Sequence, residues 1–276
     1  MSHGISAGPL GQQTQYVSVY SPELLFPIPR AASRTTLQLD SGNLPFYGVD
    51  IWTGYELSWL DERGKPVVAL AEFRIPCTSA AIVESKSFKL YLNSFNQSRF
   101  EDAAAVCAIL KKDLSAVVGA EVAVSLQRIM NADSFAVSAL KGVCLDDLPV
   151  TIDTYHPEPD LLAVHSQSRA EETLVSHLLK SNCPVTGQPD WASVQIDYAG
   201  AQIDHEGLLR YIVSFREHQD FHEHCVERMF VDIMARCQPE RLSVYARYTR
   251  RGGLDINPFR TTEPDGQPVA VRLVRQ

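Results

Sequence analysis

Alternation of apolar and polar residues predicts β-strands at several places along the chain. In residues 55–75, two alternating runs flank a polar turn at 61–66. Gly64 and Pro66 suit a chain reversal there, so this stretch is predicted to form a β-hairpin. Further half-buried strands are predicted at residues 121–127, 191–198 and 242–249.

Apolar residues spaced three and four apart predict helices between these strands. Residues 101–118 carry such a stripe, begin with two acidic residues and stop before Gly119, which suits a helix end. In the second half of the chain, the same spacing predicts helices at 204–217 and 221–237. Each half therefore offers strands, helices and a strand, which indicates an α+β fold with antiparallel sheet and helices on one face.

Irregular stretches set the expected domain boundaries. Residues 1–45 are rich in Gly, Ser, Pro and Gln, and we expect an irregular N-terminal arm with a short packed piece at 24–28. Residues 153–170 contain two prolines and mixed polar residues, and are expected to form a linker. The two modules would then span residues 46–152 and 171–276.

Composition narrows the class of protein. The chain has 276 residues and a net charge of −8, which argues against a protein whose main task is to grip a nucleic-acid backbone. Its six cysteines form no C-x-x-C pair, and the first residues lack the basic and apolar segments of a signal peptide. No apolar run approaches the ~18 residues of a membrane span. We therefore expect a cytoplasmic protein with free thiols and no membrane contact.

The stretch "SNCPVTGQPDW" places Cys183 before a proline-glycine turn and Asp190 after it. Most cysteines in such a chain are buried structural thiols, and Asp190 could simply be a turn residue. The polar turn around Cys183 favours a second interpretation, in which both side chains face one cavity. A thiolate would then attack an electrophilic carbon while the carboxylic acid protonates the atom that gains charge.

The stretch "ESKSFKLYLNSF", residues 84–95, allows two interpretations. It could be an amphipathic edge strand, protected from further pairing by its lysines. It could instead build a phosphate site from Lys86, Lys89 and serine hydroxyls, with Glu84 binding a donor-rich base. Neither glycine-rich phosphate-binding motif occurs in the chain, so a dinucleotide would have to bind outside a Rossmann fold.

The stretch "DFHEHC", residues 220–225, begins the last predicted helix. Its histidines and Cys225 could suggest a metal site, but neighbouring helix positions point apart and the H-E-x-x-H motif is absent. His222 could instead be a polar partner for a ligand, and Glu223 a carboxylate acceptor.

Three arginines precede a double glycine in "RYTRRGGLDINP", residues 247–258. A solvated charge run is the plain interpretation. Glycines also let a backbone approach a phosphate closely, and an arginine can donate two parallel hydrogen bonds to phosphate oxygens. An RNA-binding loop built on residues 247–253 is the further alternative.

Together these four stretches resemble the NADPH-dependent nitrile reductases of queuosine biosynthesis, the 7-cyano-7-deazaguanine reductases, in their long two-module form. The similarity runs from about Leu44 to Gln276. The resemblance implies the tunnelling fold (T-fold), with two tandem modules and a homodimer. It also implies reduction of the nitrile of a deazaguanine to a primary amine by two NADPH, without direct contact with nucleic acid.

The resemblance also implies roles for individual residues. Cys183 would be the nucleophile that forms a thioimide with the nitrile carbon, and Asp190 the proton donor. The substrate would be lined by Val83, Glu84, Ser85, His222 and Glu223. NADPH would be held by Ser85, Lys86, Arg251 and Gly252. No metal takes part in this chemistry.

Physical reasoning supports a covalent route, because a nitrile carbon is a poor hydride acceptor until a thiolate has added to it. Asp190 has to keep its proton until it is needed, which requires partial burial. Glu84 lies in the first half of the chain and Cys183 in the second, so we expect the pocket between the modules. The alternatives are a cysteine-dependent nitrile hydrolase, which uses no NADPH, and a purine- or RNA-binding module.

Overall fold

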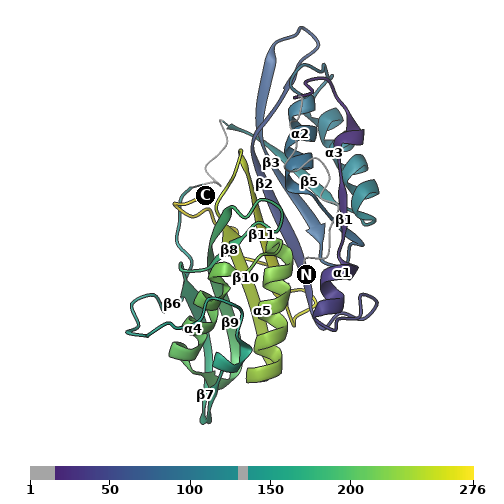
Figure 1. Ribbon diagram of the computed structural model, residues 1–276. Coiled ribbons are helices and arrows are strands. Elements are labelled where there is room, and N and C mark those ends of the chain that lie inside the picture. The colour runs from purple at the N-terminus through teal and green to yellow at the C-terminus, as the bar shows by residue number, and fades with distance from the viewer. Residues whose placement is uncertain (1–15, 130–135) are drawn as a thin grey trace. The chain divides into compact units, whose positions relative to one another are not determined.

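The computed structural model describes residues 16–129 and 136–276 (Figure 1). Its chain divides into two compact units. Unit 1 consists of Met1–Ala32, Ile51–Ser134 and Arg251–Leu254, and unit 2 of Ser33–Asp50, Phe135–Arg250 and Asp255–Gln276. Sheets that are antiparallel apart from the parallel pair β6–β7, together with a small number of helices, make up the two units, which confirms the predicted α+β class.

The sheet of unit 1 has the strand order β5-β3-β2. The predicted hairpin is confirmed, since β2 (Tyr47–Leu60) and β3 (Pro66–Pro76) flank a turn in which Gly64 has a φ of 82°. Strand β5 (Ala123–Arg128) pairs antiparallel with β3. A separate two-stranded sheet joins β1 (Pro27–Pro29) to β4 (Ala81–Val83), after the short 3₁₀ turn Pro22–Leu24.

Two helices complete unit 1. Helix α3 (Ala103–Val118) is capped by the Asp102 side chain and ends at Gly119, whose φ of 70° is the left-handed conformation that glycine tolerates. Its predicted range was therefore correct to within two residues. The predicted edge strand at residues 84–95 is wrong, because this stretch forms helix α2 (Ser85–Ser94). Its buried residues recur with helical spacing, as Ser87, Phe88, Tyr91 and Ser94 do.

The sheet of unit 2 has the strand order β11-β10-β9-β7-β6. The strands are β6 (Val143–Cys144), β7 (Val164–Ser176), β9 (Pro189–Ile203), β10 (Arg241–Tyr248) and β11 (Leu254–Thr261), and the short β8 (Lys180–Asn182) pairs with β9. Helix α4 (His205–Ser214) leads through the 3₁₀ turn Phe215–Glu217 to α5 (His222–Cys237), which packs on β10. The N-terminal segment adds α1 (Ala31–Thr36), and Pro159–Leu161 form a 3₁₀ turn.

Three expectations about irregular segments need correction. Strand β7 begins at Val164, inside the predicted linker 153–170. The predicted arm contains β1 and α1, and Arg34 of α1 is buried by ion pairing rather than exposed. The alternative loop at residues 247–253 overlaps β10, which ends at Tyr248, so Arg247 is a buried strand residue.

The two units repeat one helical arrangement. Tyr91 of α2 donates a hydrogen bond to Asp113 of α3 at 2.7 Å, and Tyr211 of α4 donates one to Asp232 of α5 at 2.7 Å. Three positions after each tyrosine, a serine hydroxyl donates to the tyrosine carbonyl at 2.6 Å. Helices α3 and α5 both have 16 residues, and the four positions that α3 buries are also buried in α5, which buries five more. The helix starts differ, because Ala103 and Ala104 of α3 correspond to His222 and Glu223 of α5.

Candidate active site

The hairpin of β8 and β9 presents the candidate nucleophile. Cys183 follows β8 directly, and its amide donates to the Gln188 carbonyl at 2.8 Å. The Gly187 amide returns a hydrogen bond to the Cys183 carbonyl at 3.0 Å, and Gly187 has a φ of 67°. The proline-glycine stretch therefore forms a tight turn that fixes the backbone on both sides of the cysteine.

Strand register places Cys183 and Asp190 on one face of this hairpin. Asp190 lies directly opposite Ser181, and residues two apart on a strand point to the same side. Cys183 and Asp190 are thus diagonal neighbours across the hairpin, a relation that brings Cβ atoms to roughly 7–8 Å. Only 7% of Cys183 and 4% of Asp190 is exposed, which gives Asp190 the burial that its proposed task requires.

A short parallel bridge ties this hairpin to the start of α5. The Asn182 amide donates to the His218 carbonyl at 2.8 Å, and the Asp220 amide donates to the Asn182 carbonyl at 3.2 Å. Asn182 and Gln219 form the bridge. The residue before the nucleophile is therefore held within a few residues of His222.

His222 joins α5 to the hairpin through its side chain. Its Nε2 lies 3.3 Å from Asp190 Oδ2, and both side chains are largely buried. The His222 ring stacks on Tyr248 of β10 with a centroid distance of 3.7 Å and an interplanar angle of 2°. The ring plane and its approach to Asp190 are thus both fixed. Cys183, Asp190 and His222 together form the candidate site of unit 2.

A second thiol, that of Cys225, lies near this site, but it is fully buried and its pKa is raised. Cys225 is fully buried and interacts with Ser181, Tyr248 and the Asp190 charge. Burial, reinforced by the negative charge of Asp220, raises the pKa of the Cys225 thiol far above its usual range. Cys225 therefore remains a neutral thiol, and both it and Cys183 are free cysteines in the structure.

Glu223 is the second residue of α5 and only 2% exposed. Phe221, the residue that precedes the helix, supplies no side-chain hydrogen bond to the first turn. A carboxylate is favoured at this end of a helix by the helix dipole. Glu223 is therefore a buried carboxylate in the first turn of α5, directly after His222 in the sequence.

His224 faces away from this group. Its Nδ1 lies 3.1 Å from Asp220 Oδ1, and His218 Nε2 lies 3.7 Å from the other oxygen of the same carboxylate. Burial raises the pKa of Asp220, but its interactions with His218 and His224 lower it by more, so the pKa of Asp220 is well below its usual range. The two neighbouring histidines, His222 and His224, thus serve different carboxylates and do not share a metal.

The remaining predicted site residues lie in unit 1. Glu84 caps α2, where its two carboxylate oxygens accept from the Lys86 amide at 2.8 Å and the Ser87 amide at 2.7 Å. Val83 and Glu84 are each 1% exposed, whereas Ser85 and Lys86 are half-buried. The start of α2 therefore already binds the Glu84 carboxylate. The Ser85 hydroxyl and the Lys86 ammonium group are the side-chain groups next to it that could bind a further anion.

Arg251 and Gly252 follow β10 and also belong to unit 1. Gly252 has a φ of 61°, and a Cβ at this position would lie 3.3 Å from the Lys89 side chain. A lysine of α2 and an exposed glycine backbone are thus close neighbours, an arrangement that suits a phosphate.

Comparison with known protein families gives two matches. Residues 16–126 match the family described as nitrile reductase, 7-cyano-7-deazaguanine-reductase N-term, and residues 189–266 match the family described as QueF-like protein. The chain belongs to the 7-cyano-7-deazaguanine reductase family. Several members of this family are similar to the chain over nearly its whole length.

Three of these family members illustrate the similarity, and each is named NADPH-dependent 7-cyano-7-deazaguanine reductase. The protein from Dechloromonas aromatica is 57% identical over 98% of this chain and 95% of its own length. The Azoarcus sp. protein is 57% identical over 99% of this chain and 97% of its own, and the Burkholderia multivorans protein 58% identical over 97% and 98%.

Some residues around the site of this reductase family member were not predicted from the sequence. In the sequence, Tyr248 and Ser181 look like ordinary strand residues. Only the structure shows that Tyr248 stacks on His222 and that both residues lie close to Cys225. Arg247 was expected in an exposed loop, but it is 6% exposed and donates to Gln276 Oε1 at 2.8 Å and to the Tyr245 hydroxyl at 2.6 Å. It is therefore not available to RNA.

Proposed function

We propose that this chain reduces the nitrile of 7-cyano-7-deazaguanine to the aminomethyl group of 7-aminomethyl-7-deazaguanine in tRNA queuosine biosynthesis. The observation that carries the proposal is the buried Cys183, held on one face with Asp190 and His222. The full-length similarity to NADPH-dependent reductases supports the same reaction. The overall change consumes two NADPH and two protons for each nitrile.

Cys183 acts first. Its sulfur forms a bond with the nitrile carbon, one π bond of the C≡N group breaks, and Asp190 delivers a proton to the nitrogen. The product is a thioimide, which accepts hydride more readily than a nitrile. NADPH supplies the hydride for each of the two reductions. Release of the Cys183 sulfur after the first reduction leaves an imine, whose second reduction gives the amine.

His222 positions the proton donor. With its ring held against Tyr248, Nε2 can hydrogen-bond to Asp190 and return a proton to it between the two reductions. The burial of all three groups limits the access of water, which would otherwise hydrolyse the thioimide or the imine.

Glu223 recognises the base in this proposal. The ring N–H and exocyclic amine of a deazaguanine lie side by side and match the two oxygens of one carboxylate. Glu223 is buried at the helix start next to His222, and the corresponding residue of unit 1 is Ala104. The family resemblance also assigns Val83, Glu84 and Ser85 of unit 1 to the substrate, and the Glu84 carboxylate already accepts hydrogen bonds from two amides.

NADPH phosphates would be held by Ser85, Lys86, Arg251 and Gly252. These residues fit a phosphate group, because a hydroxyl, two cationic side chains and a backbone without a Cβ are present in unit 1. No step of the reaction depends on a metal in this proposal.

The tunnelling fold is the proposed architecture, with one module in each half of the chain. The repeated Tyr–Asp pairs and the matched helices support two modules of common design. Within the described residues no helix is both long and apolar enough to cross a membrane. We place the enzyme in the cytoplasm as a homodimer, which sedimentation analysis of the full chain tests directly.

The principal alternative is a cysteine-dependent nitrile hydrolase, which would form the same thioimide and then add water. It differs from the reductase in cofactor use, since only the reductase oxidises NADPH in step with nitrile loss. A purine- or RNA-binding module is less well supported, because Arg247 is buried.

Two measurements test the proposed function together. Intact-mass analysis after mixing the protein with the nitrile, without NADPH, should reveal an adduct of one substrate mass. Cys183→Ala should abolish it, and Cys107→Ser, at a half-buried thiol elsewhere, should retain it. Adding NADPH should then discharge the adduct to amine with two NADPH oxidised per product. An adduct that yields amide or acid without NADPH oxidation would establish the hydrolase instead.

A further inference from the structure

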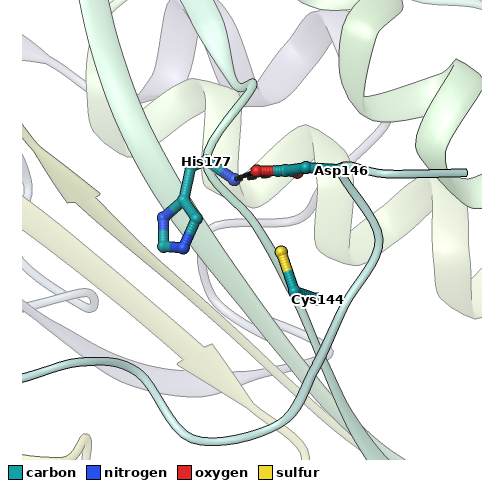
Figure 2. A group of neighbouring side chains, drawn as sticks. All are labelled: Cys144, Asp146 and His177. Carbon is teal, nitrogen blue, oxygen red and sulfur yellow. Dashed lines mark hydrogen bonds between the residues drawn. The ribbon is translucent and has the colours of Figure 1, made fainter.

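We infer that unit 2 carries a binding site for Zn²⁺, formed by Cys144, Asp146 and His177 and separate from the reductase chemistry. One ligand atom of each residue lies within 4.8 Å of the others. Figure 2 shows the Asp146 carboxylate against the His177 main-chain nitrogen, with the Cys144 sulfur nearby and the His177 ring directed away from the carboxylate. The proposed reaction uses none of these three residues.

Strand pairing brings the three residues together. Strand β6 pairs parallel with β7, with Cys144 opposite Val175. His177 follows two positions after Val175 and Asp146 two positions after Cys144, so both lie just past the paired residues. The Leu145 amide donates to the Val175 carbonyl at 2.9 Å and extends the pairing up to Asp146. The site is thus built on the backbone rather than on long flexible side chains.

Hydrogen bonds hold the Asp146 carboxylate in place. Oδ1 accepts from the Ser176 hydroxyl at 2.7 Å, and Oδ2 accepts from the His177 amide at 3.0 Å. Each carboxylate oxygen has two lone pairs, so Oδ2 can still bind a cation. Because the Asp146 carboxylate is held in place before the metal binds, the entropic cost of binding is lower.

The His177 ring is also oriented in advance. Its Nδ1 lies 2.8 Å from the Ser193 hydroxyl of β9, and that oxygen also accepts from Arg275 Nη2 at 2.9 Å. With Nδ1–H donating to Ser193, the lone pair of Nε2 is the ligand. Such a second hydrogen bond, which fixes the ring and its tautomer, is the usual support for a histidine that binds zinc.

The chemistry of the three ligands selects the metal. A thiolate, an imidazole and a carboxylate suit Zn²⁺, whereas Mg²⁺ and Ca²⁺ prefer oxygen ligands alone. Bond lengths of about 2.0–2.3 Å require ligand atoms roughly 3.3–3.7 Å apart, so the side chains have to move together by about 1 Å. Cys144 and His177 are exposed, which permits this movement and leaves a fourth position for water.

Binding has a structural consequence as well as a chemical one. Zn²⁺ displaces the thiol proton of Cys144, so one proton is released as the Zn–S bond forms. The ion then links the short edge strand β6 to the end of β7, and through Ser193 to β9. Zn²⁺ should therefore stabilise this edge of unit 2 against unfolding.

Calorimetric titration of the chelator-treated full chain with Zn²⁺ tests the inference. Cys183 could also bind zinc, so wild type and variants are compared in a Cys183→Ala background. We expect Cys144→Ser to weaken binding at one site by more than about tenfold, and Ser193→Ala by about tenfold. Cys107→Ser is the matched control, because Cys107 lies outside the cluster and should not alter binding. Equal affinity and stoichiometry in Cys144→Ser and its parent would overturn the inference.

Cobalt substitution supplies a second and independent readout. Co²⁺ bound at this site should show a thiolate-to-metal charge-transfer band that His177→Gln weakens and Cys144→Ser removes. Zn²⁺ should also raise the unfolding temperature of the wild-type chain but not that of Cys144→Ser. If the band persists in Cys144→Ser, the metal binds elsewhere and the assignment is wrong.

Discussion

The imidazole of His222 stacks on the phenol ring of Tyr248, with centroids 3.7 Å apart and planes inclined by 2°. Helix α5 contributes the first ring and strand β10 the second. Because the stack fixes the imidazole plane, the direction from His222 Nε2 to Asp190 is set by a strand that carries no proposed catalytic group. Tyr248 is therefore a positioning residue for the proton-transfer pair.

Two substitutions of Tyr248 should distinguish the contribution of its ring from that of its hydroxyl. Tyr248→Phe keeps the stack and should retain most of the activity, because the ring and not the hydroxyl packs against His222. Tyr248→Leu removes the stack and should lower kcat by about tenfold with little change in KM, since the misplaced group acts in proton transfer rather than in binding.

The pH dependence of kcat is the readout that a purely structural role would leave unchanged. Tyr248→Leu should shift the pH profile, and Tyr248→Phe should not. Wild-type kcat and profile in Tyr248→Leu, with the protein folded as judged by circular dichroism, would contradict the positioning role.

Glu223→Gln should affect substrate binding more than chemistry. The substitution replaces one oxygen acceptor by an amide donor that faces a donor of the base. A mismatch of this kind costs about 1–3 kcal/mol, so kcat/KM for the nitrile should fall roughly tenfold to a hundredfold, mainly through KM. Steady-state kinetics at saturating NADPH measures the effect.

Glu206→Gln provides the matched control, since this glutamate is exposed on α4 and pairs with Arg210 at 2.9 Å. Its kinetic constants should equal those of the wild type. If Glu223→Gln lowers kcat alone and leaves KM unchanged, Glu223 does not recognise the base.

The fold could be predicted from the sequence wherever one face of an element is buried. Helix α3 shows clear periodicity, because it buries only one residue in every four and its other face is not buried. Strand β11 was missed because it is buried on both faces and contains Asp255, Asn257 and Arg260, whose polar groups are paired inside the protein. Helix α2 was mistaken for a strand because its serines and lysines interrupt the apolar pattern.

Of the candidate site, only the part formed by neighbouring residues of the sequence could be predicted. The turn around Cys183 has a local signature, so both its conformation and the shared face with Asp190 could be anticipated. The contact between His222 and Asp190 joins residues from a helix and a strand, and no local sequence pattern predicts it. The same holds for Cys144, Asp146 and His177, since they meet only through the parallel pairing of β6 and β7.

Stability at acidic pH should depend on Asp220. Burial raises the pKa of Asp220, but its interactions with His218 and His224 lower it by more and keep it below the unfolded value of about 3.9. A depressed pKa stabilises the folded state above the unfolded pKa, and this contribution is lost as the pH falls below about 4. The stability difference between wild type and Asp220→Asn should therefore be largest near neutral pH and shrink in acid.

Urea unfolding at a series of pH values measures that difference. Asp265→Asn is the control, because Asp265 is exposed and should give no pH-dependent difference. If the stability difference between wild type and Asp220→Asn grew as the pH fell below about 4, the lowered pKa of Asp220 would be contradicted.

Glu227 of α5 is the centre of a buried ion-pair network in unit 2. Its Oε1 accepts from Arg34 Nη2 at 2.8 Å and from Arg260 Nη2 at 2.9 Å, and Arg260 Nη1 donates to Asp50 Oδ1 at 2.7 Å. All four side chains are at most 2% exposed. The network fastens the N-terminal segment, through α1 and the start of β2, to α5 and β11.

Removing the central carboxylate should destabilise the protein strongly, because two guanidinium groups would stay buried without their shared anion. Glu227→Ala should lower the free energy of unfolding by about 3–5 kcal/mol. Glu206→Gln, which breaks an exposed pair, should cost no more than about 1 kcal/mol. Denaturant unfolding of both variants provides the comparison. If Glu227→Ala lost no more than Glu206→Gln, the network would not hold the N-terminal segment, and α1 would be retained by its apolar contacts alone.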